Sequence, residues 1–133
     1  MKNFSKEEKN NLENTMKNLK AQLENFPTIL IIFGATGDLM ERKLLPAIFN
    51  LYQTNFLPNL FQVIGFAKET FTEKEYRNWL RKNLPRKKVM EDFLTKFFYQ
   101  PGFFENFESY LAIGKRLGLV DREWRTCSNK LFY

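Results

Sequence analysis

The sequence predicts an α/β fold, in which a parallel sheet of about four strands is flanked by helices and one extra helix precedes the sheet. Two continuous apolar runs, 28–33 and 61–67, are typical of parallel strands that are buried on both faces. Strand patterns alternate with helical patterns along the chain, as they do in folds built on a parallel sheet. A turn with two glycines joins the first run to a helix.

Residues 5–25 are predicted to form the extra helix. Ser5 and Glu8 fit the S-x-x-E capping box, in which each side chain accepts from a free backbone N–H of the first turn. One narrow apolar seam follows, made by Leu12, Met16, Leu19 and Leu23. A partner-binding or coiled-coil helix is one interpretation. Because the seam spans few heptads, we favour a helix that packs on its own domain.

Strand and helix signals alternate from Pro27 onward. After the strand at 28–33 we expect, in chain order, a helix to about 55, a strand at 61–67, helices at 72–84 and 88–96, a strand at 97–100, a helix at 105–118 and a strand at 129–133. Pro46 is expected in the first turn of its helix, where a missing N–H costs nothing, and Gly118 at the end of another. The expected inward side chains are Leu45, Ile48, Phe49, Tyr52, Tyr76, Trp79, Leu80, Tyr110, Leu111 and Leu117.

Composition excludes several classes of site. The 133 residues are enough for one compact domain. A single cysteine, Cys127, excludes an internal disulfide, and the lack of histidine excludes the commonest general base and every histidine-based zinc site. We therefore expect no metal. The net charge of +6 is spread along the chain and predicts a solvated surface rather than a nucleic-acid interface.

The chain gives no membrane or export signal. No apolar run approaches the roughly 20 residues of a membrane helix. The first 25 residues are polar and carry acidic side chains, unlike a signal or transit peptide. We expect a cytoplasmic protein that binds no membrane.

The glycine turn is the candidate site. Gly34 and Gly37 follow the strongest strand, and they let the backbone turn sharply and approach a ligand closely. The first N–H groups of the next helix then face an anion such as phosphate. Thr36 adds a hydroxyl, whereas Asp38 is expected to cap the helix. The Walker and G-x-G-x-x-G spacings are both absent.

The stretch IIFGATGDLMERKLLPAIFNL resembles the N-terminal coenzyme segment of glucose-6-phosphate dehydrogenases, whose pattern G-[AG]-[ST]-G-D-L-x-x-[RK]-K-[LI]-x-P runs here from Gly34 to Pro46. The later VIGFAK is similar to the family's second strand, and the terminal NKLFY to the start of its fourth. Weaker matches near its third strand are Tyr99, Gly102, Phe104 and Tyr110. The resemblance covers residues 28–133, with 1–27 as a helical extension. It implies an incomplete, Rossmann-like, doubly wound coenzyme domain.

The resemblance implies specific coenzyme contacts. Lys43 matches a lysine near the nicotinamide, and Lys68 matches the basic position that meets the adenosine 2′-phosphate of NADP. Glu69 follows directly, and its carboxylate could accept from a free 2′-hydroxyl, which keeps NAD as an alternative. The pyrophosphate would lie on Gly34, Ala35, Thr36, Gly37, Asp38 and Leu39.

The resemblance also implies what this chain lacks. The family's histidine general base has no counterpart, so we assign no catalytic residue and expect the isolated chain not to oxidise glucose 6-phosphate. The implied strand order, 3-2-1-4, leaves residues 129–133 as an open edge, and a second polypeptide could complete the sheet and the active site.

Two alternatives to a dehydrogenase fragment remain open from the sequence. One is a nucleotide binder similar to short-chain dehydrogenases or epimerases, although Met40 stands at their third glycine position. The other is a non-enzymatic module that binds a partner through residues 5–25 or the basic surface.

Overall fold

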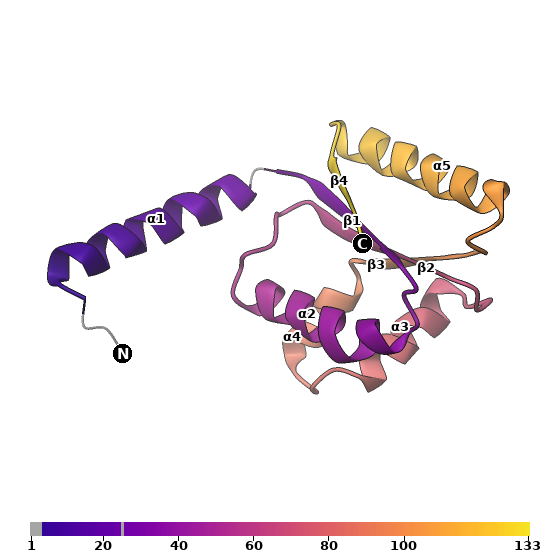
Figure 1. Ribbon diagram of the computed structural model, residues 1–133, viewed down its shortest axis with the longest axis horizontal. Coiled ribbons are helices and arrows are strands. Elements are labelled where there is room, and N and C mark those ends of the chain that lie inside the picture. Colours follow the sequence, from indigo (N-terminus) through magenta and orange to yellow (C-terminus); the bar gives the residue numbers. More distant parts are fainter. Residues whose placement is uncertain (1–3, 25) are drawn as a thin grey trace.

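The computed structural model describes residues 4–24 and 26–133, and its centre is a four-stranded parallel sheet (Figure 1). The strands are β1 (Thr28–Phe33), β2 (Phe61–Ala67), β3 (Phe97–Pro101) and β4 (Asn129–Phe132). They lie in the order β3-β2-β1-β4, with β1 paired to β2 and β4 in parallel. The predicted α/β class and the order 3-2-1-4 are both confirmed.

Helices lie on both faces of this sheet, and one further helix precedes it. In chain order the helical segments are α1 (Lys6–Glu24), the π-helical segment η1 (Met40–Leu44), α2 (Leu45–Gln53), α3 (Glu73–Lys82), α4 (Lys88–Leu94) and α5 (Phe107–Trp124). Figure 1 shows α2, α3 and α4 on one side of the sheet and α5 on the other. Across the described residues, no helix combines the length and apolar character needed to cross a membrane.

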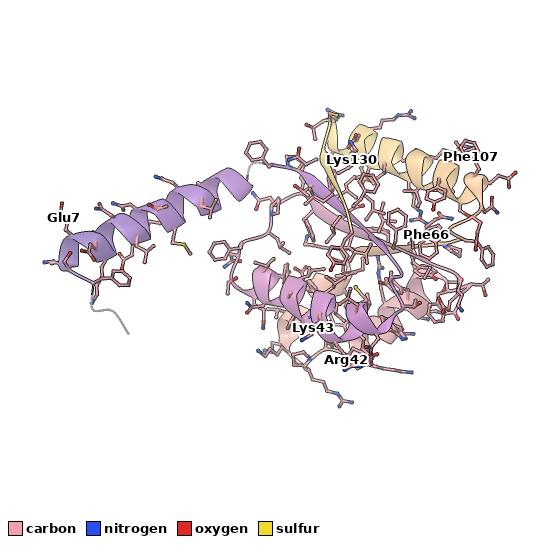
Figure 2. The ribbon with its side chains drawn as sticks, viewed as in Figure 1. Glu7, Arg42, Lys43, Phe66, Phe107 and Lys130 are labelled. Carbon is pink, nitrogen blue, oxygen red and sulfur yellow. The ribbon has the colours of Figure 1, made fainter. Side chains whose placement is uncertain are left out.

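The core has two parts because successive strand side chains point to opposite faces. On β1, Ile29 and Ile31 pack toward α5, whereas Ile32 joins the larger cluster under α2, α3 and α4. Phe66 of β2 lies on the α5 side (Figure 2). Burial of β1 from both sides explains why its sequence is a continuous apolar run rather than an alternating one.

Helix α5 differs from the prediction at its end. We expected it to stop at Gly118, and that prediction is wrong, because the helix continues to Trp124. The packing side chains repeat at spacings of four, three and four on both sides of the glycine: Ile113, Leu117, Val120 and Trp124. A glycine inside a helix costs about 1 kcal/mol, which burial of this face offsets.

The inward face of α5 was also partly misplaced. Tyr110 and Leu111 are 41% and 51% exposed, so neither is the buried side chain we expected. The helix ends at Arg125, whose φ of 56° is the left-handed conformation common at helix C-termini. Neither a glycine nor a proline marks this end, which is why the sequence pattern missed it.

Helix α1 projects away from the rest of the chain (Figure 1). Ser5 Oγ accepts from the backbone N–H of Glu8 at 3.1 Å, which is half of the predicted capping box. Leu12, Met16 and Leu19 are 54%, 43% and 46% exposed. The expectation that this helix packs on its own domain is therefore wrong, while the side chain of Leu23 lies outside what the structure describes.

Strand β4 is an open edge that is fastened to α5. Leu131 and Phe132 are 55% and 61% exposed, so the predicted open edge also carries uncovered apolar side chains. Asp121 of α5 holds the connection: its carboxylate accepts from the hydroxyl of Ser128 at 2.5 Å and from the ammonium of Lys130. These hydrogen bonds lower the pKa of Asp121, with the bond from Lys130 as the largest cause.

Replacement of the Asp121 carboxylate tests how much these hydrogen bonds between α5 and β4 stabilise the fold. Asp121→Asn should lower the free energy of unfolding by about 1 kcal/mol near neutral pH, because it removes a charged hydrogen-bond acceptor. Since the folded pKa is depressed, the stabilisation is present above about pH 3.8 and is lost as pH falls through the lower folded pKa. Urea unfolding at several pH values measures it, with the exposed Glu123→Gln as control. An equal loss at acid and neutral pH would contradict this assignment.

Candidate nucleotide site

The glycine turn is tied to the second strand by backbone hydrogen bonds. The N–H of Gly34 donates to the carbonyl of Phe66 at 2.8 Å, and the N–H of Gly37 donates to the carbonyl of Gly34 at 3.0 Å. Gly34 has a φ of +74°, a conformation that residues with a side chain rarely adopt. The turn therefore requires glycine at this position.

A helix starts directly from the turn. The N–H of Glu41 donates to the carbonyl of Gly37 at 3.1 Å, which closes the first helical bond. Among the described residues, no acceptor receives the N–H groups of Thr36, Asp38 and Leu39. Three free donors at the start of a helix form a ready anion-binding position.

The helix widens after its first turn. In η1, the N–H of Leu45 donates to the carbonyl of Met40, five residues earlier rather than four. Pro46 follows, at the start of α2, as predicted. A proline inside a regular helix would clash with the carbonyl four residues earlier, so the widened turn is where this chain accommodates it.

A buried tyrosine anchors the turn from below. The hydroxyl of Tyr76 donates to the carbonyl of Ala35 at 3.0 Å, and both residues are fully buried. The ring needs Gly65 of β2, because a Cβ there would lie 2.8 Å from the tyrosine oxygen and 2.8 Å from the Ala35 Cβ. Burial also raises the pKa of Tyr76, so the hydroxyl remains a donor.

A pocket of about 390 Å³ lies above the turn, over the carboxyl ends of β1, β2 and β3. Its lining residues are Gly34, Thr36, Gly37, Ala67, Lys68, Glu69, Gly102, Phe103, Phe104 and Glu105. Ligands of open α/β sheets bind in crevices at this edge. A larger hollow of about 890 Å³ involves the C-terminal end of α3, away from this edge, and we do not assign it to the site.

The strand-end residues give the pocket its charges. Lys68 is exposed, whereas Glu69 is half-buried and accepts from the Thr36 hydroxyl at 2.7 Å. That hydrogen bond is the largest cause of a lowered pKa of Glu69. The hydroxyl of Tyr99 donates to the Glu69 carbonyl at 2.6 Å, and burial raises the pKa of Tyr99 to about 12.

The predicted site residues divide into two groups. The pocket brings together Gly34, Thr36, Gly37 and Lys68. The others do not line it: Ala35 is buried beneath the turn, while Asp38, Leu39 and Lys43 are exposed on the helix that follows. Figure 2 shows Arg42 and Lys43 on this helix.

Asp38 corrects a local prediction. We expected its side chain to cap the helix, but the carboxylate instead pairs with Arg42 at 2.7 Å, one turn along the surface. Asp38 lies within the first turn, where its negative charge still interacts favourably with the positive end of the helix dipole. Because the carboxylate is engaged by Arg42, the free N–H groups of this turn stay uncovered.

Sequence reasoning missed the third wall of the pocket. Phe103, Phe104 and Glu105 follow β3, and Gly102 turns the chain there. A Cβ at Gly102 would lie 2.6 Å from the Phe66 ring and 2.6 Å from Ser109 Oγ, so this glycine serves close packing. The available signal was topological, because the carboxyl ends of neighbouring parallel strands meet at one edge. In the described residues, no cluster of three or more His, Cys, Asp or Glu side chains could hold a metal.

A parallel sheet of order 3-2-1-4, with helices on both faces and a glycine turn at the carboxyl end of its first strand, defines a dinucleotide-binding α/β domain. A family profile described as "Glucose-6-phosphate dehydrogenase, NAD binding domain" matches residues 31–133. The chain belongs to the glucose-6-phosphate dehydrogenase family, as the N-terminal nucleotide-binding part. This membership disfavours the alternative of a short-chain dehydrogenase or epimerase.

Individual relatives support the same family assignment. Glucose-6-phosphate 1-dehydrogenase of Chlamydia pneumoniae is 37% identical over 114 residues, which are 80% of this chain and 22% of that protein. The chloroplastic enzyme of Nicotiana tabacum is 34% identical over 78% of this chain and 18% of its own length. The chain thus spans about a fifth of the length of these relatives.

Solved structures give the same fold. A glucose-6-phosphate dehydrogenase solved with its substrate glucose 6-phosphate superposes with a TM-score of 0.76 at 28% identity, over 84% of this chain and 24% of that one. The enzyme from Mycobacterium avium, at 20% identity, shares the fold with a TM-score of 0.67 over 80% of this chain and 23% of its own.

The left-handed glycine makes the turn testable. Gly34→Ala should cost about 1–2 kcal/mol in free energy of unfolding, because a Cβ is strained at positive φ even though nothing lies within 4 Å of it. Gly118→Ala is the matched control: its Cβ also meets open space, but in a helix it should stabilise by about 0.5–1 kcal/mol. Chemical denaturation measures both, and equal effects would argue against the conformation described for Gly34.

Proposed function

We propose that this chain binds NADP at the carboxyl edge of its sheet, as the coenzyme-binding part of a glucose-6-phosphate dehydrogenase. The observation that carries the proposal is the set of free N–H donors of Thr36, Asp38 and Leu39 beside a pocket at the strand ends. Donors of this kind bind a diphosphate without any charged side chain. Family membership supports a nicotinamide dinucleotide as the ligand.

The two ends of the pocket suggest how the coenzyme lies. The diphosphate would accept from the free amides of the turn, and the adenosine half would occupy the pocket over β2 and β3. Lys68 would meet the 2′-phosphate, since a cation at the end of the second strand favours NADP over NAD. A lysine provides a point charge there, which is less directional than a guanidinium.

The nicotinamide half would extend toward β4. Lys43, exposed one turn along the helix, matches the family position near the nicotinamide and substrate. When bound, the coenzyme supplies the hydride acceptor for oxidation of the sugar. This chain's own contribution is to bind and orient it, and no residue here is assigned to proton removal.

The open edge at β4 suggests a partner of a particular kind. β4 pairs with β1 on one side, and its exposed Leu131 and Phe132 resemble an uncovered core. A second polypeptide that adds strands beside β4 would bury these side chains. It would also enclose the nicotinamide end of the site.

Coenzyme titration tests the assignment of Lys68. The chain should bind NADP more tightly than NAD, and added salt should weaken NADP binding, because the 2′-phosphate contact is electrostatic. Lys68→Ala should weaken NADP binding about tenfold and leave NAD binding nearly unchanged. Lys74→Ala, an exposed lysine on α3, is the control. Calorimetry or intrinsic fluorescence measures all three. Equal, salt-insensitive binding of both coenzymes would overturn the role of Lys68.

The activity of the chain by itself is a separate prediction. With no histidine among its 133 residues, the purified chain should not reduce NADP in the presence of glucose 6-phosphate, even at saturating coenzyme. A positioned general base contributes about 10²–10⁴-fold to such a rate. Absorbance of the reduced nicotinamide measures turnover. Steady formation of reduced coenzyme that depends on the sugar would refute the prediction.

A further inference from the structure

Glu69 is the one carboxylate of the pocket that other elements hold in place among the described residues. Its Oε2 accepts from the hydroxyl of Thr36, in the turn after β1, at 2.7 Å. Its backbone carbonyl accepts from the hydroxyl of Tyr99, on β3, at 2.6 Å. The residue is therefore fixed from both neighbouring strands, and its side chain reaches back to the phosphate-binding turn.

This carboxylate carries a negative charge at neutral pH. The hydrogen bond from Thr36 is the largest influence on it, and Lys68 adds a smaller attraction, so the pKa of Glu69 lies below its usual value. A fixed anion thus stands beside the cation that would meet a 2′-phosphate.

The adenosine riboses of NAD and NADP interact with the Glu69 carboxylate in opposite ways. A free 2′-hydroxyl can donate to a carboxylate, which is the contact by which dinucleotide folds favour NAD. A 2′-phosphate has no hydrogen to donate when ionised and is repelled by a nearby carboxylate. Lys68 acts in the other direction, but it is exposed and no hydrogen bond within the described chain fixes it.

We propose that Glu69, held in place by the Thr36 hydroxyl, is a specificity-determining residue that opposes Lys68 and admits NAD alongside NADP. This inference rests on the proposed function, because it concerns the same pocket and the same class of coenzyme. It makes Thr36 a positioning residue as well as a member of the phosphate-binding turn.

Glu69→Gln tests the proposal in the full chain. The amide keeps the size of the side chain and an oxygen that can accept from Thr36, but removes the charge. The ratio of the NAD and NADP dissociation constants, measured by calorimetry, should shift about tenfold toward NADP. Glu123→Gln is the control, because Glu123 is an exposed carboxylate of α5 that does not line this pocket. It should change the ratio little.

Thr36→Val tests whether the Glu69 carboxylate must be held in place, because this variant keeps the carboxylate but removes the hydroxyl that binds it. Loss of the hydroxyl should raise the pKa of the Glu69 carboxyl toward its ordinary value, which carbon-detected NMR titration reports without any coenzyme. The coenzyme ratio should shift in the same direction as in Glu69→Gln.

The outcomes are distinguishable. If the unmodified chain binds neither coenzyme, the proposed function fails and this inference fails with it. If it binds NADP but Glu69→Gln leaves the ratio unchanged, or Glu123→Gln changes it equally, the inference alone is wrong. A shift toward NADP in both Glu69→Gln and Thr36→Val but not in Glu123→Gln, together with the raised carboxyl pKa in Thr36→Val, supports it.

Discussion

The hydrogen bond from the Gly34 N–H to the Phe66 carbonyl determines the form of the site. It continues the pairing of β1 with β2 by one residue beyond the sheet, and the chain then reverses at positive φ. Tyr76 secures the same turn from beneath by its bond to Ala35. The carbonyls of Gly34, Ala35 and Gly37 thus all accept hydrogen bonds within the protein. These bonds hold the turn in shape, while several N–H groups at the start of the helix find no acceptor in the described part of the chain.

Charge at the site is divided between backbone and side chains. In the proposed function, the turn binds a diphosphate through neutral amides, so that its affinity depends on geometry rather than on a lysine or arginine. Discrimination between coenzymes then depends on a different place, the end of β2, where Lys68 and Glu69 are neighbours of opposite charge. If both proposals hold, binding and selectivity can be changed independently in this domain.

Much of this architecture follows from local sequence. The apolar runs of β1 and β2 and the glycines at 34 and 37 predicted the strands, their parallel pairing and the turn. The end of α5 could not be predicted, because Gly118 carries a stop signal that tertiary packing overrides. Nor could the sequence foresee the hydrogen bond from Thr36 to Glu69, since it joins residues 33 positions apart that only the sheet brings together.

The hydrogen bonds between α5 and β4 have a consequence for the outer edge of the sheet. Asp121 of α5 binds Ser128 and Lys130 near the start of β4. The position of β4 is therefore stabilised both by α5 and by pairing with β1. The outer edge of β4 therefore presents backbone groups in a fixed register beside the exposed side chains of Leu131 and Phe132. A strand pairing there, as in the proposed function, would meet an alignment that α5 already stabilises.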